Sequence, residues 1–284
     1  MKKYGDGAWL DAMYNNRERV PQHPAILARW ARESAKARTE GPCELDIAYG
    51  DGPREQLDVF PAPSGDAPVL VFVHGGYWRA MDKSDHSFIA PAFHRDGACV
   101  VLPNYGRCPD LTIPQITLQV ARAVAWTWHN IARYGGDRRR IVVAGHSAGG
   151  QLATMMLSCL WPQLDAALPR DAVCGALAIS ALHDLDPLMR TPFLQPALRL
   201  TPEQVQLASP ARLPAPRQGT LYTVAGGSES AEYHRQNRLI QDGWGARRVP
   251  VCELAPGRDH FTVLDALVEP RHRVHQLALD LLRA

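Results

Sequence analysis

The sequence lacks the features that mark membrane-spanning, nucleic-acid-binding and metal-dependent proteins. No apolar run approaches the length of a membrane-spanning helix, and no apolar region of a signal peptide follows the two lysines near the N-terminus. The formal net charge of +2 gives no electrostatic reason to bind nucleic acid or an anionic membrane. There is no His-Glu-x-x-His motif, and His272 and His275 have no ligand set near them, so we expect no metal.

Cysteine is scarce and scattered. The six cysteines form no Cys-x-x-Cys pair, which is typical of a reducing compartment, and we expect a cytoplasmic location. There is no internal repeat and no low-complexity segment. What the chain does have is length and apolar content, with 284 residues of which 46% are hydrophobic. That suffices for a large core, and α/β folds of this size often form a single domain.

Eight short apolar segments are predicted to be strands, and helical patterns separate most of them. The strands are expected at residues 45–49, 56–60, 69–73, 98–102, 141–144, 174–180, 221–225 and 251–254. Strands that alternate with helices predict an α/β fold, an eight-stranded and mostly parallel sheet with helices on both faces. One of the predicted helices, from Ser84 to Arg95, is interrupted by Pro91.

Two stretches stand apart from this alternation. Residues 1–42 have a helical pattern and precede the first strand, so we expect an N-terminal helical extension that packs on the main domain at 43–284. Residues 187–216 hold seven of the 23 prolines, which excludes long regular elements there. Because this stretch lies between the sixth and seventh strands, residues 181–217 have two interpretations, a cap or lid over the site and a surface excursion without a role.

The motif with the clearest chemical meaning is Gly-x-Ser-x-Gly at residues 145–149, centred on Ser147. The β-branched run at 141–144 predicts a buried parallel strand before it. After it, apolar residues recur at the spacing of one helix face from Leu152 to Leu160. A strand, a sharp turn and a helix around this motif are the context of a nucleophile elbow, in which the serine hydroxyl stands above the sheet. Ser147 is therefore the candidate nucleophile.

A nucleophilic serine needs a histidine base, and His260 is the preferred candidate. It follows the eighth predicted strand, at the sheet edge where Ser147 also lies, and in this fold the histidine comes last in chain order. His183, which follows the sixth strand, is the rival. Three further histidines lie on or next to predicted helices, where we expect surface positions: His234, His272 and His275.

The acid that orients the histidine is expected at Glu229, in the turn after the seventh strand. It would hold the tautomer of the imidazole and stabilise the imidazolium. Asp184, after the sixth strand, is the main alternative. Asp259 adjoins His260 in sequence, where two side chains rarely face each other well, and Glu232 lies at a predicted helix start, where capping explains a carboxylate.

The loop after the third strand reads His-Gly-Gly-Tyr-Trp at residues 74–78. In this fold that loop supplies one donor of an oxyanion hole, and the residue after the nucleophile supplies another. Glycines let the backbone approach a substrate and turn its N–H groups towards developing negative charge. The candidate donors are the backbone N–H groups of Gly75, Gly76, Tyr77 and Ala148, and His74 is expected to have a structural hydrogen-bonding role.

Four segments together resemble the kynurenine formamidases (arylformamidases), which are α/β-hydrolases, and their bacterial esterase relatives. They are His-Gly-Gly-Tyr-Trp at 74–78, Gly-His-Ser-Ala-Gly-Gly at 145–150, Ser-Glu-Ser-Ala-Glu-Tyr-His-Arg-Gln at 228–236 and His-Phe at 260–261. The resemblance extends from about residue 45 to the end of the sequence. The first motif is more specific than the serine motif, because hormone-sensitive-lipase-like esterases carry His-Gly-Gly-Gly at this place.

The resemblance implies Ser147 as nucleophile, His260 as base and Glu229 as acid. Many relatives have Asp at the acid position, which keeps Asp184 open as the alternative. The resemblance also implies that three aromatic residues shape the substrate pocket: Tyr77, Trp78 and Tyr105.

The expected function is that of a serine hydrolase without cofactors, which removes a formyl or short acyl group from an aryl formamide or ester through an acyl-enzyme. Two alternatives stay open, a general short-chain carboxylesterase without formamide preference and a hydrolase-fold protein that holds a ligand without cleaving it. The expected partner is a small-molecule substrate, with no nucleic acid and no membrane, and a homodimer stays open.

Overall fold

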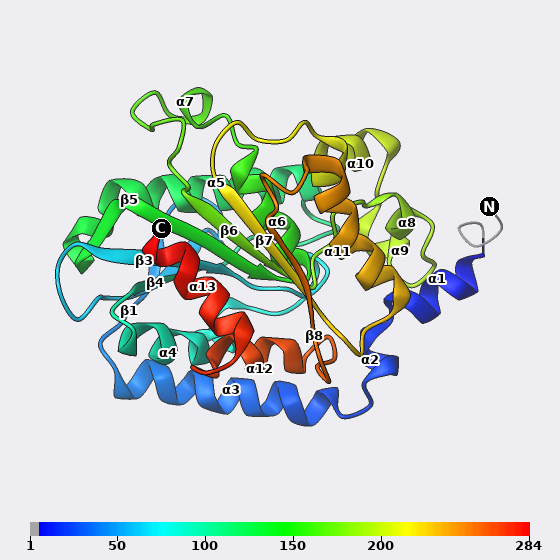
Figure 1. The fold of residues 1–284 in the computed structure, drawn as a ribbon, viewed down its shortest axis with the longest axis horizontal. Helices are drawn as coiled ribbons and strands as arrows, with labels where there is room; N and C mark the ends of the chain where they lie inside the picture. Colours follow the sequence, from blue (N-terminus) through cyan, green and yellow to red (C-terminus); the bar gives the residue numbers. More distant parts are fainter. Residues whose placement is uncertain (1–5) are drawn as a thin grey trace.

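A single mixed sheet forms the centre of the protein, seen in a computed structural model that describes residues 6–284 (Figure 1). In this part of the chain eight strands follow the order β1-β2-β4-β3-β5-β6-β7-β8. The pairs β1–β2 and β2–β4 are antiparallel, and all other neighbours are parallel. The predicted mostly parallel sheet of eight strands is thus confirmed. The strands are β1 (Glu44–Ala48), β2 (Gln56–Phe60), β3 (Ala67–Val73), β4 (Cys99–Pro103), β5 (Gly136–His146), β6 (Gly175–Ile179), β7 (Thr220–Gly226) and β8 (Val251–Ala255).

Helices cover both faces of the sheet (Figure 1). One face packs against α5 (Ile113–Asn130), α6 (Ala148–Leu157) and α11 (Ala231–Trp244), and the other against α3 (His23–Glu40), α4 (Ala90–Arg95), α12 (Thr262–Val268) and α13 (Arg273–Arg283). Further short helices are α1 (Gly7–Tyr14), α2 (Asn16–Arg19) and α7 (Trp161–Leu164). Among residues 6–284, every helix falls short of the length and apolar content that crossing a bilayer demands.

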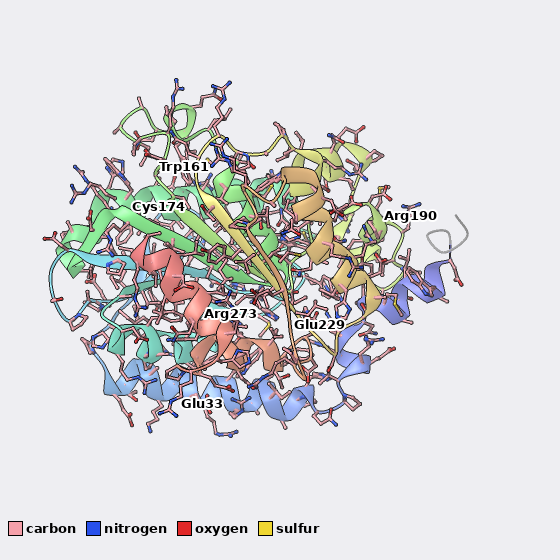
Figure 2. All side chains as sticks on the ribbon, viewed as in Figure 1. Glu33, Trp161, Cys174, Arg190, Glu229 and Arg273 are labelled. Carbon is pink, nitrogen blue, oxygen red and sulfur yellow. The ribbon has the colours of Figure 1, made fainter. Side chains whose placement is uncertain are left out.

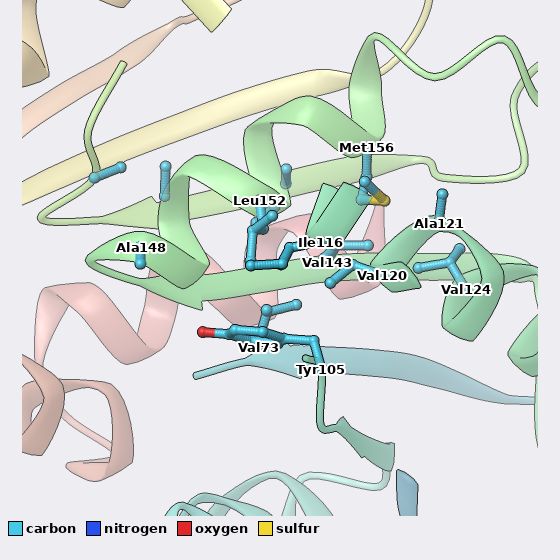
Figure 3. Close-up of a cluster of buried hydrophobic side chains, with 14 of the residues drawn as sticks. Val73, Tyr105, Ile116, Val120, Ala121, Val124, Val143, Ala148, Leu152 and Met156 are labelled. Carbon is cyan, nitrogen blue, oxygen red and sulfur yellow. The ribbon is translucent and has the colours of Figure 1, made fainter. Parts of the chain in front are cut away.

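Two hydrophobic cores result, one on each face, because side chains alternate along a strand. In β3, Val69, Val71 and Val73 belong to the core under α5 and α6, and Leu70 and Phe72 belong to the core under the other helices. Figure 3 shows part of the first core, in which Val73 and Val143 from the sheet meet Ile116, Val120 and Leu152 from the helices. The elbow helix α6 is therefore packed against the sheet and against α5.

Two expectations about helices differ in outcome. The helix predicted from Ser84 to Arg95 with an interruption at Pro91 is present only in part: two 3₁₀ turns (Lys83–Asp85 and Ser87–Ile89) come first, and α4 begins at Ala90 and contains Pro91. Pro91 thus stands in the first turn of a helix, where its missing N–H costs nothing. The proline-rich stretch contains only short elements, as predicted, namely α8 (Asp186–Met189), α9 (Gln195–Leu198), α10 (Pro202–Ala208) and a 3₁₀ turn at Pro210–Arg212.

Candidate active site

Ser147 stands at a sharp turn between β5 and α6. Its backbone angles are φ 58° and ψ −118°, a conformation that non-glycine residues rarely adopt. Two glycines make the turn sterically feasible. A Cβ atom on Gly145 would lie 2.1 Å from the carbonyl oxygen of Gly149, and one on Gly149 would lie 2.0 Å from that of Val73. Both positions therefore require glycine, because a larger residue would clash with neighbouring backbone atoms.

The structure brings Ser147, His260 and Glu229 together in one line of contacts. Ser147 Oγ lies 3.1 Å from His260 Nε2, and His260 Nδ1 lies 2.8 Å from Glu229 Oε2. The three residues come from different segments, separated by 113 and 31 positions along the chain. At these distances the imidazole can take the proton of the hydroxyl, and the carboxylate can stabilise the imidazolium that forms.

Glu229, which is labelled in Figure 2, is held in place by two further donors from the ends of β6 and β7. Its Oε1 accepts the backbone N–H of Gly226 at 2.6 Å and the hydroxyl of Ser180. The carboxylate side chain is fully buried, so each oxygen is supplied with donors from the protein rather than from water. The role of Ser180 was missed from the sequence, although its position directly after β6 is a usable signal.

The rival residues have other partners. His183 is fully buried, contacts Thr154 and Gln236, and does not contact Ser147. Burial lowers the pKa of His183 to about 4, which keeps it neutral. Asp184 Oδ1 accepts from Arg212 Nε at 3.0 Å. The geometry therefore favours His260 and Glu229 over both alternatives.

The remaining rivals are also accounted for. Asp259 Oδ1 accepts the backbone N–H groups of Phe261 and Thr262, and Glu232 pairs with Arg235 and accepts from the hydroxyl of Tyr14.

The expected surface position of His275 is wrong. This side chain is fully buried between Leu267 and Asp96, because the helix that carries it packs closely on the sheet.

His146, the variable residue before the serine, holds the base in position. Its Nε2 lies 2.7 Å from the carbonyl oxygen of His260, so this nitrogen is the donor and carries the ring proton. Burial and the neighbouring His260 lower the pKa of His146 well below its usual value. A neutral His146 therefore fixes the backbone of the loop that carries the base.

In the loop at residues 74–78, several backbone carbonyl groups accept hydrogen bonds from the protein. The hydroxyl of Tyr105 lies 2.8 Å from the carbonyl oxygen of His74 and 3.2 Å from that of Gly75, and the carbonyl of Gly76 accepts the N–H groups of Arg79 and Ala80. In a trans peptide the C=O and the following N–H point in opposite directions. The N–H groups of Gly76 and Tyr77 are thereby turned away from these anchors, and both residues line the cavity that contains Ser147.

Unusual backbone angles make this loop possible. Gly76 has φ 104°, Tyr77 has φ 50° and Trp78 has φ 53°, so three successive residues occupy a region that disfavours side chains. A Cβ atom on Gly76 would also lie 2.2 Å from the carbonyl oxygen of Ala80. Position 76 therefore accepts only glycine.

The other two candidate donors lie on either side of the serine. Ala148 begins α6, and the first N–H groups of a helix have no acceptor within the helix. Gly75 lies against the serine itself, since a Cβ at this position would be 3.1 Å from Ser147 Cβ. The absence of a side chain at Gly75 lets the loop approach Ser147 closely, and Gly75 is not among the described residues that line the cavity.

Trp78 and Tyr105, which the resemblance places in the substrate pocket, do not line the cavity. Both are fully buried. Trp78 Nε1 donates to Gln151 Oε1 at 3.1 Å, and the Tyr105 ring stacks on His74 with centroids 4.3 Å apart. Large rings are needed here to pack behind a loop built from two glycines, so both residues support the loop instead of contacting substrate.

His74 has the structural role expected of it. Its Nε2 lies 3.0 Å from Asn104 Oδ1, and burial lowers its pKa to about 3.

Tyr77 is held from the opposite side by the N-terminal segment. Its hydroxyl donates to the backbone carbonyl of Tyr14 at 2.6 Å and lies 2.7 Å from the hydroxyl of Tyr233. Because the single Tyr77 proton is used on the carbonyl, Tyr233 is the donor in the second contact. Asn16 Nδ2 in turn donates to Tyr233 at 2.8 Å. No local sequence pattern indicates this buried network, in which Tyr14 and Glu232 are 218 positions apart.

A cavity of about 560 Å³ opens above Ser147 and His260. One wall is the loop around Tyr77, and another is the N-terminal segment at residues 15–18 with Trp30 behind it. Phe193 is the only residue of the proline-rich stretch among the described lining residues. A volume of this size suits a small molecule.

Comparisons with known proteins agree with this fold. The family model described as BD-FAE matches residues 57–167. Kynurenine formamidase of Danio rerio is 29% identical over 255 residues, which cover 87% of this chain and 84% of that protein. Esterase LipC of Mycobacterium tuberculosis is 36% identical over 140 residues, which cover 45% of this chain and 35% of that protein.

Solved structures show the same architecture. The crystal structure of a putative thioesterase from Silicibacter sp. has a TM-score of 0.84 at 29% identity and covers 97% of this chain and 99% of its own. An esterase of Pyrobaculum calidifontis has a TM-score of 0.69 at 18% identity, with 92% and 93% covered, and this likeness concerns the fold alone.

Proposed function

Because this chain has the α/β-hydrolase fold and is similar to a kynurenine formamidase over most of its length, we propose that it is a serine hydrolase that acts through an acyl-enzyme. The substrate class is an aryl formamide or ester from which a formyl or short acyl group is removed. The observation that carries the proposal is the line of contacts from Ser147 through His260 to Glu229, with distances of 3.1 and 2.8 Å.

In the first half of the reaction, His260 Nε2 takes the proton of the Ser147 hydroxyl while Oγ attacks the acyl carbon. The carbonyl oxygen becomes negative and accepts hydrogen bonds from the backbone N–H groups of Gly76, Tyr77 and Ala148. Removal of one such donor typically costs about a hundredfold to a thousandfold in rate. His260, now charged and paired with Glu229, then gives its proton to the leaving nitrogen or oxygen as the bond to the acyl carbon breaks.

In the second half, water attacks the acyl group on Ser147. His260 accepts a proton from this water and returns it to Ser147 Oγ as the ester bond breaks, which releases a carboxylic acid. An anilide nitrogen departs poorly without a proton, whereas an activated phenolate departs readily. Loss of proton donation by His260 should therefore slow formamides more than activated esters.

The substrate assignment is tested by kcat/KM on an N-formyl arylamine and on a series of short acyl esters, including a thioester. A kcat/KM for the formamide that equals or exceeds that for the matched acyl ester supports an arylformamidase. The second candidate is a short-chain carboxylesterase, which the similarity to bacterial esterases favours. It predicts good ester turnover and at least about a hundredfold lower kcat/KM on the formamide, equivalent to about 2.7 kcal/mol.

The serine mechanism has its own test. A fluorophosphonate or sulfonyl fluoride should label one residue, Ser147, and the Ser147→Ala variant should not be labelled. Without labelling of Ser147 and without turnover of any ester or formamide, the remaining reading is a hydrolase-fold protein that holds a ligand.

A further inference from the structure

Two residues of the N-terminal segment, Tyr14 and Asn16, hold the two ends of a chain of hydrogen bonds that runs through the site. Asn16 Nδ2 donates to the hydroxyl of Tyr233 at 2.8 Å, and that hydroxyl lies 2.7 Å from the hydroxyl of Tyr77. The hydroxyl of Tyr77 donates to the backbone carbonyl of Tyr14 at 2.6 Å. The chain of bonds therefore leaves the N-terminal segment at Asn16 and returns to it at Tyr14.

The carbonyl of Tyr14 sets the direction of every bond in this chain. A carbonyl oxygen can only accept, so the proton of Tyr77 is committed to it, and Tyr77 acts only as an acceptor towards Tyr233. Tyr233 uses its own proton on Tyr77 and accepts from the amide of Asn16. Burial raises the pKa of both tyrosines, so both hydroxyls keep their protons. Hydrogen bonds that point the same way along a chain strengthen one another.

Tyr77 needs such an anchor because its backbone is strained. It has φ 50°, and its neighbours Gly76 and Trp78 also have positive φ. Strained conformations of this kind persist only where the surrounding structure holds them. The backbone N–H of Tyr77 is a candidate oxyanion donor, and the hydroxyl at the far end of the side chain is the anchored group. Loss of the anchor would let the residue relax towards an ordinary backbone conformation and move its N–H.

The N-terminal segment is itself fixed to α11, the helix that follows the acid. α1 and α11 lie side by side (Figure 1). The hydroxyl of Tyr14 donates to Glu232 Oε2 at 2.8 Å and accepts from Gln236 Nε2 at 3.1 Å. Tyr233 on the same helix packs its ring against His260, with centroids 4.6 Å apart. The first turns of α11 therefore connect the N-terminal segment to the base.

We propose that the N-terminal segment completes the oxyanion hole, with Asn16 and Tyr233 as positioning residues that act through Tyr77. This inference rests on the proposed function, because it concerns the same reaction. The hydrogen bond from the Tyr77 N–H strengthens only when the carbonyl oxygen of the substrate becomes negative. Loss of the anchor should therefore lower kcat and leave KM nearly unchanged.

The test compares phenyl acetate with O-phenyl thionoacetate, in which sulfur replaces the carbonyl oxygen. Sulfur is a weak acceptor, so the thionoester gains less from the oxyanion donors. The measured quantity is the ratio of the two kcat/KM values, oxygen over sulfur. Damage to the fold or to the base acts on both substrates and leaves this ratio unchanged. We expect Tyr77→Phe to lower the ratio about tenfold or more, through kcat for phenyl acetate.

The two positioning residues have their own variants. Tyr233→Phe and Asn16→Ala remove the bonds further along the chain, and each should lower the ratio about threefold or more. The double variant Asn16→Ala/Tyr233→Phe should be no worse than Tyr233→Phe alone, because Asn16 acts only through the hydroxyl of Tyr233. Additive losses would contradict this order of action.

The matched control is Tyr49→Phe. The hydroxyl of Tyr49 is also buried and also donates to a backbone carbonyl, that of Asn104, at 2.6 Å, but Tyr49 is not among the described residues that line the cavity. The control should lower the melting temperature about as much as Tyr77→Phe does, because each loses a buried hydrogen bond. Its ratio should stay within about twofold of that of the unmodified protein.

A second readout needs no turnover of the thionoester. Phenyl trifluoromethyl ketone adds to the Ser147 hydroxyl and forms a hemiketal whose oxygen is negative, so it resembles the transition state. Its inhibition constant should rise about tenfold or more in Tyr77→Phe and stay unchanged in Tyr49→Phe. If the unmodified protein hydrolyses phenyl acetate but not the thionoester, this constant decides the question.

An unchanged ratio and an unchanged inhibition constant in both Tyr77→Phe and Tyr233→Phe would overturn the inference and leave these hydrogen bonds a purely structural role. Failure of the proposed function gives a different result, because the unmodified protein would then hydrolyse neither ester and the ketone would not bind to Ser147. That result would overturn the inference together with the proposed function.

Discussion

Replacement of Glu229 by glutamine tests how the buried carboxylate controls the tautomer of His260. Glu229 receives three donors, two of them at Oε1 and one, from His260 Nδ1, at Oε2. A glutamine has one acceptor oxygen and one NH₂ group. The oxygen should stay at the position of Oε1, because the N–H of Gly226 is fixed by the backbone and an NH₂ group facing it would leave buried donors unpaired, at a cost of about 1–3 kcal/mol.

The NH₂ group then faces His260 Nδ1 and must donate to it. The proton of the imidazole moves to Nε2, which points at Ser147 Oγ at 3.1 Å and can no longer accept the serine proton. A wrong tautomer of this kind lowers kcat by about 10⁴ in serine proteases, equivalent to about 5.4 kcal/mol of transition-state stabilisation. We expect a loss of similar size in Glu229→Gln.

The assay is steady-state hydrolysis of phenyl acetate, with circular dichroism and a thermal melt to show that the variant is folded. Asp184→Asn is the matched control. Asp184 pairs with Arg212 away from His260, and loss of a partly exposed ion pair costs little, so kcat should change less than about threefold. A folded Glu229→Gln variant that retains more than about a tenth of the activity, or a larger loss in Asp184→Asn, would refute the reasoning.

Three further predictions concern the nucleophile, the elbow and stability. Ser147→Ala should remove measurable turnover of an activated aryl ester and leave the melting temperature unchanged within a few degrees; residual turnover at the original rate would contradict the assignment. Gly149→Ala should destabilise the protein by more than about 4 kcal/mol or prevent folding, because the new Cβ would lie 2.0 Å from the carbonyl oxygen of Val73 in β3. The control is Gly243→Ala in α11, whose Cβ would lie at an ordinary contact distance of 3.4 Å from the carbonyl oxygen of Ala211. Urea unfolding should show this variant to be as stable as the unmodified protein or more stable. Burial lowers the pKa of His74 to about 3 and that of His183 to about 4, from the ordinary histidine value of 6.5. The unfolded chain therefore binds more protons between pH 6.5 and those values, so thermal stability should fall as the pH is lowered through this window, by at most about 1.4 kcal/mol per pH unit for each histidine. A flat pH profile there would contradict their burial as neutral groups.

The strand pattern and the elbow could be predicted because their signals are local. A continuous apolar run such as Val69–Val73 has apolar side chains on both faces of its strand, so it predicts a strand inside a sheet that is covered on both faces. All eight predicted strands are present. Gly145 and Gly149 are required by backbone contacts within the turn and with the adjacent strand. The choice of His260 and Glu229 relied on chain order in this fold, and chain order is visible in a sequence.

The aromatic residues of the loop show where local signals end. Trp78 and Tyr105 are as compatible with a pocket as with a core when only the sequence is known. Their burial follows from packing behind the glycines of the loop, and that packing partner lies about thirty positions away along the chain for Tyr105 and His74. The buried position of His275 was hidden for the same reason, because its acceptors Leu267 and Asp96 come from two other helical segments.

The sequence by itself determined the order of the elements, the turn that exposes Ser147 and the three kinds of side chain that a serine hydrolase needs, since each depends on residues close together in the chain. Only the tertiary structure decided which carboxylate faces His260 and that Tyr77 is anchored by Tyr14 and Tyr233. These pairings depend on the distance in space between segments far apart in sequence, and that distance is set by how the helices pack on the sheet.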